Sequence, residues 1–194
     1  MSLGQQNVFY KKAACFVLRS LAKHSSSLSK AIINSGVLES LAICVEEFDP
    51  GVKESAVWAL AYIAKHNENL ARTVADSGCV PAIVLALQEP DPNLKRISAL
   101  ALNEISKHSL DLANIVVESG AAPYLSQQIN HHDAQLKKQV CQTLASIAKH
   151  SAELAETVVG AELFPKILYK LKDLDEGVRK MAATVIREVT KQSP

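Results

Sequence analysis

The chain has 194 residues, and its 21 Lys and Arg residues nearly balance its 20 Asp and Glu residues. A net charge of +1 excludes general electrostatic attraction to nucleic acid or to an anionic membrane. A hydrophobic share of 48% and a charged share of 21% are typical of a folded chain rather than a disordered one. The N-terminus shows no signal segment and the chain no apolar run of membrane-spanning length, so we expect a cytoplasmic protein.

The sequence repeats itself with a period of 42 residues. The same interval carries a Lys-His pair, a Ser-Gly pair, a proline and an aspartate through successive units. The Lys-His pairs are Lys23-His24, Lys65-His66, Lys107-His108 and Lys149-His150. A fixed period between 20 and 50 residues is typical of proteins in which structural repeats stack. The period predicts four repeats, at residues 25–66, 67–108, 109–150 and 151–194.

The N-terminal segment, residues 1–24, contains only the last helix of a repeat, because residues 9–24 align with residues 51–66. The two helices that would precede it are absent from the sequence. We expect Cys15, Leu18 and Leu21 of this orphan third helix to lack a cover. The chain would then be a piece or a shortened form of a longer array, and we expect self-association through this helix.

Each complete repeat reads as a short helix, a second helix and a long third helix. In residues 67–108, Asn67 suits the N-cap of the first helix and Gly78 suits its end. Pro81 suits the first turn of the second helix. Asp91 and Pro92 suit the start of the third, which ends in the cations Lys107 and His108. No segment shows the sustained alternation of a strand, so the sequence predicts an all-α protein.

Repeats of this size cannot bury all their apolar faces alone, so they must stack around one continuous core. The sequence predicts an elongated superhelical solenoid with a concave side. The four cysteines, Cys15, Cys44, Cys79 and Cys141, form no CxxC pair and lie in apolar helical patterns. We interpret them as reduced core residues.

Residues 51–64, GVKESAVWALAYIA, resemble the third helix of an armadillo repeat. The stretches FYKKAACFVLRSLAKHS and EEFDPGVKESAVWALAYIAKHN are similar, more narrowly, to armadillo-repeat proteins of the central apparatus of motile cilia and flagella. The resemblance implies a right-handed superhelical solenoid. It further implies a microtubule-associated scaffold of the axoneme, needed for axoneme integrity and motility, with axonemal proteins as partners and the cytoskeleton and cilium as its location.

The chain departs from nuclear-import adaptors of this fold, which hold an extended basic peptide with columns of tryptophans and asparagines. Here the tryptophan column reads Phe16, Trp58, Leu100, Gln142 and Thr184. The asparagine column reads Ser20, Tyr62, Glu104, Ser146 and Glu188. Only Trp58 keeps the family residue, although the groove position itself is expected to persist. A peptide-binding adaptor of the import or signalling type therefore stays as the alternative.

Two adjacent columns of cations begin the predicted third helices, where the helix dipole disfavours positive charge. The first column is Lys11, Lys53, Lys95, Lys137 and Arg179, and we expect it to pair with nearby acids such as Asp49 or Glu89. The second is Lys12, Arg96, Lys138 and Lys180, interrupted by Glu54. This second column could form a basic stripe for acidic segments, including tubulin tails.

The predicted protein-binding groove comprises basic, apolar and polar side chains of the third helices. Its residues are Lys12, Phe16, Trp58, Tyr62, Arg96, Leu100, Glu104, Lys138, Gln142, Lys180 and Glu188. Trp58 and Tyr62 lie one turn apart and would form its binding hot spot, because large aromatics dominate interface energetics. The alternative is that Trp58 only packs between neighbouring third helices.

The repeated histidines invite a metal site, but equivalent positions on stacked helices lie about 8 to 10 Å apart or more, which is too far to share an ion. We interpret them as caps at helix C-termini. His131, His132 and Asp133 could contact a metal, yet Asp133 occupies the N-cap column. The sequence contains no nucleotide-binding, zinc-protease or serine-hydrolase motif, so we expect no enzyme, no cofactor and no metal. The balanced charge also predicts no nucleic-acid or membrane partner.

Overall fold

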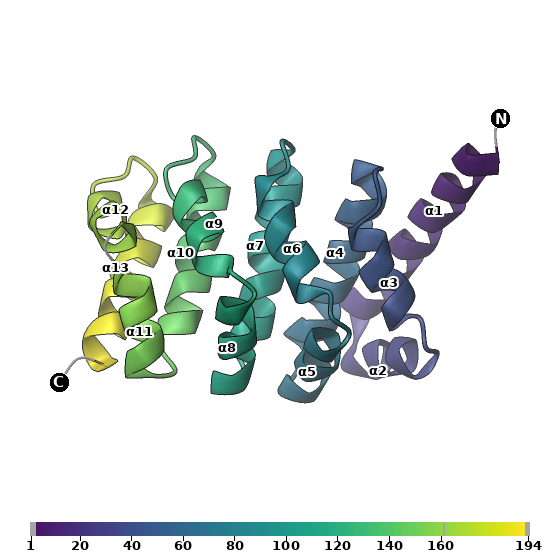
Figure 1. Cartoon of the computed structure of the whole chain (residues 1–194), viewed down its shortest axis with the longest axis horizontal. Helices are drawn as coiled ribbons and strands as arrows, with labels where there is room; N and C mark the ends of the chain where they lie inside the picture. Colours follow the sequence, from purple (N-terminus) through teal and green to yellow (C-terminus); the bar gives the residue numbers. More distant parts are fainter. Residues whose placement is uncertain (1–2, 161, 193–194) are drawn as a thin grey trace.

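The computed structural model describes residues 3–160 and 162–192, and every regular element in them is helical. The helices lie side by side in one elongated row that runs from α1 to α13 (Figure 1). The two ends of the chain lie at opposite ends of this row.

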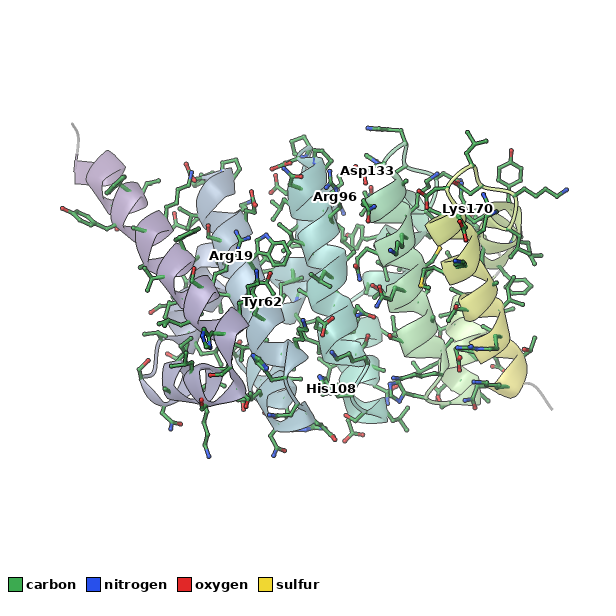
Figure 2. All side chains as sticks on the ribbon, turned by 180° about the vertical axis from the view of Figure 1, so that it is seen from behind. Arg19, Tyr62, Arg96, His108, Asp133 and Lys170 are labelled. Carbon is green, nitrogen blue, oxygen red and sulfur yellow. The ribbon has the colours of Figure 1, made fainter. Side chains whose placement is uncertain are left out.

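The third helices of the repeats form one continuous layer. They are α1 (Leu3–His24), α4 (Pro50–Lys65), α7 (Pro92–Ser106), α10 (Ala134–Ala148) and α13 (Glu176–Gln192). Each of them packs against the next third helix along the row. Seen from behind, this layer faces the viewer (Figure 2).

The first and second helices form the opposite side. The first helices are α2 (Ser26–Asn34), α5 (Glu68–Asp76), α8 (Leu110–Glu118) and α11 (Ala152–Val159). The second helices are α3 (Leu38–Val45), α6 (Val80–Leu85) with the 3₁₀ turn η1 (Ala86–Gln88), α9 (Ala121–Gln128) and α12 (Leu163–Lys170). Helices α2 and α3 meet at 92°, and α5 meets the α6–η1 segment at 88°. No single helix of the described part is long and apolar enough to cross a bilayer.

Local capping explains where the helices begin and end. The side chain of Asp49 accepts a hydrogen bond from the backbone N–H of Val52 (2.9 Å), and Asp133 and Asp175 cap their third helices in the same way. Asp91 caps α7 through the backbone N–H of Asn93, two residues along the chain (2.8 Å). Asn67 caps α5 through the Leu70 N–H (3.0 Å), as the sequence predicts. Gly78, with φ of 77°, makes the left-handed turn between α5 and α6 that side chains with a Cβ rarely adopt.

One apolar core runs through the stack. The side chains of Leu60, Leu102 and Leu144, at equivalent positions of successive third helices, are fully buried. All four cysteines are buried and none forms a disulfide, as expected. Burial raises the pKa of Cys79 to about 11 and that of Cys141 to about 12, so both remain neutral thiols.

The expectation that Cys15 lacks a cover is wrong. Cys15 is 2% exposed, because its side of α1 faces α3, where the thiol of Cys44 lies next to it. Leu18 is half-buried, and of the three residues only Leu21 is exposed, at 39%. The exposed side of α1 is therefore a different face of the helix from the one that holds Cys15.

One set of ion pairs and hydrogen bonds joins neighbouring repeats at the start of the third helices. The Lys11 ammonium pairs with Glu47, and Lys53 pairs with Glu89, in each case 36 residues further along the chain. Lys137 donates a hydrogen bond to the Asp173 carboxylate (2.5 Å) with the same separation. The predicted pairing with Glu89 is confirmed. Among the residues that the structure describes, Asp49 pairs with no lysine and instead caps α4, because its carboxylate faces the first turn of its own helix.

A second set of hydrogen bonds joins the repeats at the other end of the third helices. The imidazole Nε2 atoms of His66, His108 and His150 lie 2.7 to 2.8 Å from the backbone carbonyl oxygens of Ala22, Ala64 and Ser106. Lys107 and Lys149 also donate to carbonyls one repeat earlier. The side chains of these three histidines are therefore helix caps, but each caps the third helix of the preceding repeat rather than its own.

Candidate functional site

An open hollow of about 420 Å³ lies on the layer of third helices and spans α1, α4, α7 and α10. Apolar side chains of Trp58, Ile97 and Leu100 line it together with charged and amide side chains. The polar lining residues are Arg19, Glu54, Asn93, Arg96, Gln135 and Gln139. We call this surface the third-helix hollow. It brings together Trp58, Arg96 and Leu100 of the predicted groove.

The aromatic residues of α4 stack on each other at one side of the hollow. The rings of Trp58 and Tyr62 are 5.0 Å apart between centroids, with an angle of 20° between their planes. From α1, the Arg19 guanidinium lies 4.6 Å from the Trp58 ring centroid, and the Lys23 ammonium lies 6.0 Å from the Tyr62 centroid. Cations over aromatic faces are attracted by the negative charge of the ring face. Figure 2 shows Arg19 and Tyr62 on this face of the molecule.

Arg96 of α7 lines the hollow and forms an ion pair with the next third helix. Its guanidinium pairs with the Asp133 carboxylate at 3.0 Å, and Asp133 also caps α10. The Nε atom of Arg96 and the side-chain Nε2 atom of Gln139 are buried and have no hydrogen-bond partner in the described part of the chain. A buried donor without a partner costs free energy.

The other cations of the predicted basic stripe have different surroundings. Lys180 pairs with Glu176 at 2.6 Å, and both side chains are exposed. The side chains of Lys12 and Lys138 each extend over a glycine at the start of the next third helix, Gly51 and Gly177 respectively. Lys12 and Lys138 form no ion pair within the described residues.

The two carboxylates predicted for the groove are held by neighbouring cations. Glu104 is 7% exposed and pairs with Lys107. Glu188 accepts hydrogen bonds from Lys191 and Arg187, which outweigh the effect of burial and lower its pKa below the ordinary value. Neither carboxylate lines the third-helix hollow.

Phe16 is 57% exposed on α1, and Gln142 is half-buried on α10, but neither lines the hollow. Arg19, Lys23 and Gln139 were not among the residues predicted for the groove. Gln139 lies one turn before Gln142 on α10, so a search one turn either side of the tryptophan column would have found it. No sequence pattern identifies Arg19 and Lys23, because their aromatic partners lie one repeat away.

His131, His132 and Asp133 form part of a turn. The imidazole rings of His131 and His132 stack with their centroids 4.1 Å apart. The backbone N–H of Asp133 donates a hydrogen bond to Nδ1 of His131 (3.1 Å). Burial, helped by the charges of His132 and Lys95, lowers the pKa of His131. Across residues 3–160 and 162–192, no three His, Cys, Asp or Glu side chains gather closely enough to hold a metal ion.

Comparison with known proteins agrees with this geometry. Residues 25–65 match the family model of the Armadillo/beta-catenin-like repeat. The fold is similar to that of a designed armadillo repeat protein, with a TM-score of 0.90, 20% identity, and coverage of 94% of this chain and 76% of that protein. The fold is an armadillo solenoid.

Two further solved structures resemble this armadillo solenoid. A designed armadillo repeat protein in complex with the peptide (KR)4 has a TM-score of 0.90 and 22% identity, and the likeness covers 96% of this chain and 77% of that one. An engineered protein has a TM-score of 0.88 and 27% identity, with coverage of 91% and 73%. No curated protein matches the sequence.

Proposed function

We propose that this armadillo solenoid is a non-catalytic scaffold that binds an extended, acidic segment of another protein along its third helices. The third-helix hollow carries the proposal, because the side chains of Arg19 and Arg96 line it beside the apolar side chains of Trp58, Ile97 and Leu100. Carboxylate oxygens of a bound segment would accept charge-assisted hydrogen bonds from these guanidinium groups.

The charges around the hollow favour an acidic ligand. Arg19 and Lys23 are held over aromatic rings and form no ion pair in the described residues, so their charges stay available. Lys12 and Lys138 extend the positive charge on the same layer of helices. Three of the lining side chains are charged: the cations Arg19 and Arg96 and the carboxylate Glu54.

A binding measurement with two peptides tests the ligand class. We expect a fluorescent peptide of eight glutamates to bind and an equally long (KR)4 peptide to bind at least tenfold more weakly. The double variant Arg19→Glu, Lys23→Glu should weaken acidic-peptide binding at least tenfold, with a shallower salt dependence. The matched control is Lys30→Glu, Lys172→Glu, which makes the same charge change at exposed sites away from the hollow. Equal loss in both double variants would contradict a site at the hollow.

A second candidate is an adaptor for basic peptides, of the import or signalling type. It is favoured by the fold similarity to the designed armadillo protein that holds (KR)4. Arg19 argues against it, because its guanidinium already lies on the Trp58 ring, where it would repel a cationic ligand. Preference for (KR)4 in the measurement above would select this candidate.

We further propose that the partners are axonemal and that the location is the cytoskeleton of motile cilia and flagella. The proposal rests on the likeness of residues 9–25 and 46–67 to armadillo-repeat proteins of the ciliary central apparatus, together with cationic side chains that would suit the acidic tails of tubulin. We expect co-sedimentation with microtubules, lost when subtilisin removes the tails. A tagged chain should localise along the axoneme of ciliated cells, and a diffuse cytoplasmic signal would contradict the location.

A further inference from the structure

Glu54 is a carboxylate in a column that otherwise holds cations. The aligned positions of the five third helices are Lys12, Glu54, Arg96, Lys138 and Lys180. Glu54 lies on α4 one turn before Trp58, so the two side chains are on the same side of the helix. The Glu54 side chain is half-buried, lines the third-helix hollow and forms no ion pair among the residues that the structure describes.

Positive charge lies on both sides of Glu54 in the layer of third helices. Helix α4 packs between α1 and α7. From α1, the guanidinium of Arg19 lies 4.6 Å from the Trp58 ring centroid. From α7, Arg96 lines the same hollow, and its ion pair is with Asp133 rather than with Glu54. Figure 2 shows both arginines on this layer. A ligand that crosses the three helices therefore meets a cation, a carboxylate and a cation in turn.

This order of charges makes an unbroken run of acidic residues an imperfect ligand. One of its carboxylates would lie opposite Glu54, and like charges repel each other more strongly at a half-buried site than in bulk water. A cation at that point of the ligand would pair with Glu54 instead. The acidic residues on either side of the cation would still meet arginines, since a guanidinium has five donors and Arg96 can hold Asp133 and a ligand carboxylate together.

We propose that Glu54 selects segments in which a lysine or arginine stands between acidic residues. The ligand cation pairs with Glu54, and the flanking carboxylates pair with Arg19 and Arg96. Packed helices lie about 8 to 10 Å apart, and an extended chain rises about 3.3 Å per residue, so each acid lies about two to three residues from the cation. The inference rests on the proposed function, because it specifies the charge pattern of the ligand bound at the same hollow.

A different role for Glu54 is to balance the charge of Lys12 within the chain. The Lys12 side chain extends from α1 over Gly51, which lies one turn before Glu54 on α4. The structure records no ion pair between Lys12 and Glu54. If Glu54 only balanced this lysine, its replacement would change affinity for all acidic ligands alike and would leave their order of preference unchanged.

Three fluorescent octapeptides test the charge pattern by anisotropy. They contain glutamate at every position except the fourth, which is glutamate, glutamine or lysine. We expect the wild-type chain to bind the lysine peptide at least threefold more tightly than the all-glutamate peptide, with the glutamine peptide between them. General attraction between a cationic surface and an acidic peptide predicts the opposite order, because the lysine peptide is the least negative of the three.

Reversal of the charge at Glu54 should reverse the preference. We expect Glu54→Lys to bind the all-glutamate peptide at least threefold more tightly than the lysine peptide, and Glu54→Gln to distinguish the two less than wild type does. The matched control is Glu118→Lys, which makes the same change of net charge at an exposed site on α8 and should keep the wild-type order. Circular dichroism should show the same helix content for all four chains.

The peptide series separates this inference from the proposed function. If the all-glutamate peptide binds but the lysine peptide binds no more tightly, or if Glu54→Lys keeps the wild-type order, the role of Glu54 is overturned and the acidic-ligand site stands. If none of the three peptides binds, the proposed function is wrong and the inference falls with it. A reversed order in Glu54→Lys together with an unchanged order in Glu118→Lys would confirm the pattern.

Discussion

The imidazole of His150 lies 2.8 Å from the backbone carbonyl oxygen of Ser106, which belongs to the preceding repeat. His108 makes the equivalent contact with Ala64. Gln192 takes the place of a histidine at the last junction, where its side-chain amide donates to the Lys149 carbonyl (2.8 Å). The last carbonyls of a helix have no partner within that helix, so the next repeat completes it.

Two substitutions at His150 distinguish the contribution of its hydrogen bond to stability from the contribution of its protonation. We expect His150→Ala to lower the free energy of unfolding by about 1 kcal/mol at pH 7.5, because the Ser106 carbonyl loses its partner. His150→Gln should be close to wild type, since Gln192 shows that an amide serves at this position. Urea denaturation would measure both.

The same variants differ in pH dependence. Burial lowers the pKa of His150, and Lys149 adds to this, while the bond to Ser106 opposes it. The folded state therefore favours the neutral ring. The associated stability is fully present above the ordinary pKa of about 6.5 and is lost as the pH falls through the lowered folded pKa. We expect His150→Gln to be less sensitive to pH below 6.5 than wild type, and equal slopes would contradict this.

Breaking the ion pair between Lys137 and Asp173 should lower the free energy of unfolding more than breaking an exposed ion pair. The two side chains are 13% and 7% exposed, and Asp173→Asn would leave Lys137 without its carboxylate. We expect a loss of about 2 kcal/mol, between the values for surface and fully buried pairs. The matched control, Glu176→Gln, breaks a pair whose side chains are 68% and 67% exposed and should change stability by less than about 0.5 kcal/mol.

Asp173 should also contribute to acid sensitivity. Burial raises its pKa, but the hydrogen bonds from Lys137 and from the Asp175 backbone outweigh burial, so the pKa lies below the ordinary value. Its contribution to stability is present above the unfolded-state pKa of about 4 and is lost as the pH falls through the lower folded value. Unfolding followed between pH 5 and pH 2 should show a smaller loss of stability for Asp173→Asn than for wild type.

The single tryptophan, Trp58, reports on the third-helix hollow. Arg19→Ala removes the guanidinium over the ring and should expose the indole, shifting its fluorescence emission to longer wavelength. We expect this variant to lose about 0.5 to 1 kcal/mol of stability. Binding of the acidic peptide should also change Trp58 emission, and a spectrum unaffected by saturating peptide would place the ligand elsewhere. Lys30→Ala, on α2, is the control and should leave the spectrum unchanged.

Substitutions at Gly78 measure the energetic cost of a left-handed backbone conformation without any change in side-chain contacts. Nothing lies within 4 Å of the position that a Cβ would take, but its φ of 77° is unfavourable for other residues. We expect Gly78→Ala to destabilise the chain by about 1 kcal/mol. Gly78→Asn should cost less, because asparagine tolerates the left-handed region better than alanine. Equal losses in thermal unfolding would show that the cost does not come from φ.

The sequence predicts features that depend on neighbouring residues better than features that depend on packing between repeats. The caps at Asp91 and Asn67 were predictable because the capping side chain and the backbone N–H it binds lie within three residues. The burial of Cys15 was not, because it depends on how α1 rotates against α3. The cations over Trp58 and Tyr62 were also missed, since each pair spans about one repeat and follows no motif.

Every junction of this solenoid is secured at both ends of its third helices, by ion pairs or hydrogen bonds at one end and by side chains bound to carbonyl oxygens at the other. Bending that opens one end of a junction would have to stretch contacts there while it compresses those at the other end. A repeat inside the row is restrained by two such junctions, whereas α1 and α13 each have one in the described chain. Mechanical or thermal unravelling should therefore begin at the ends and advance one repeat at a time.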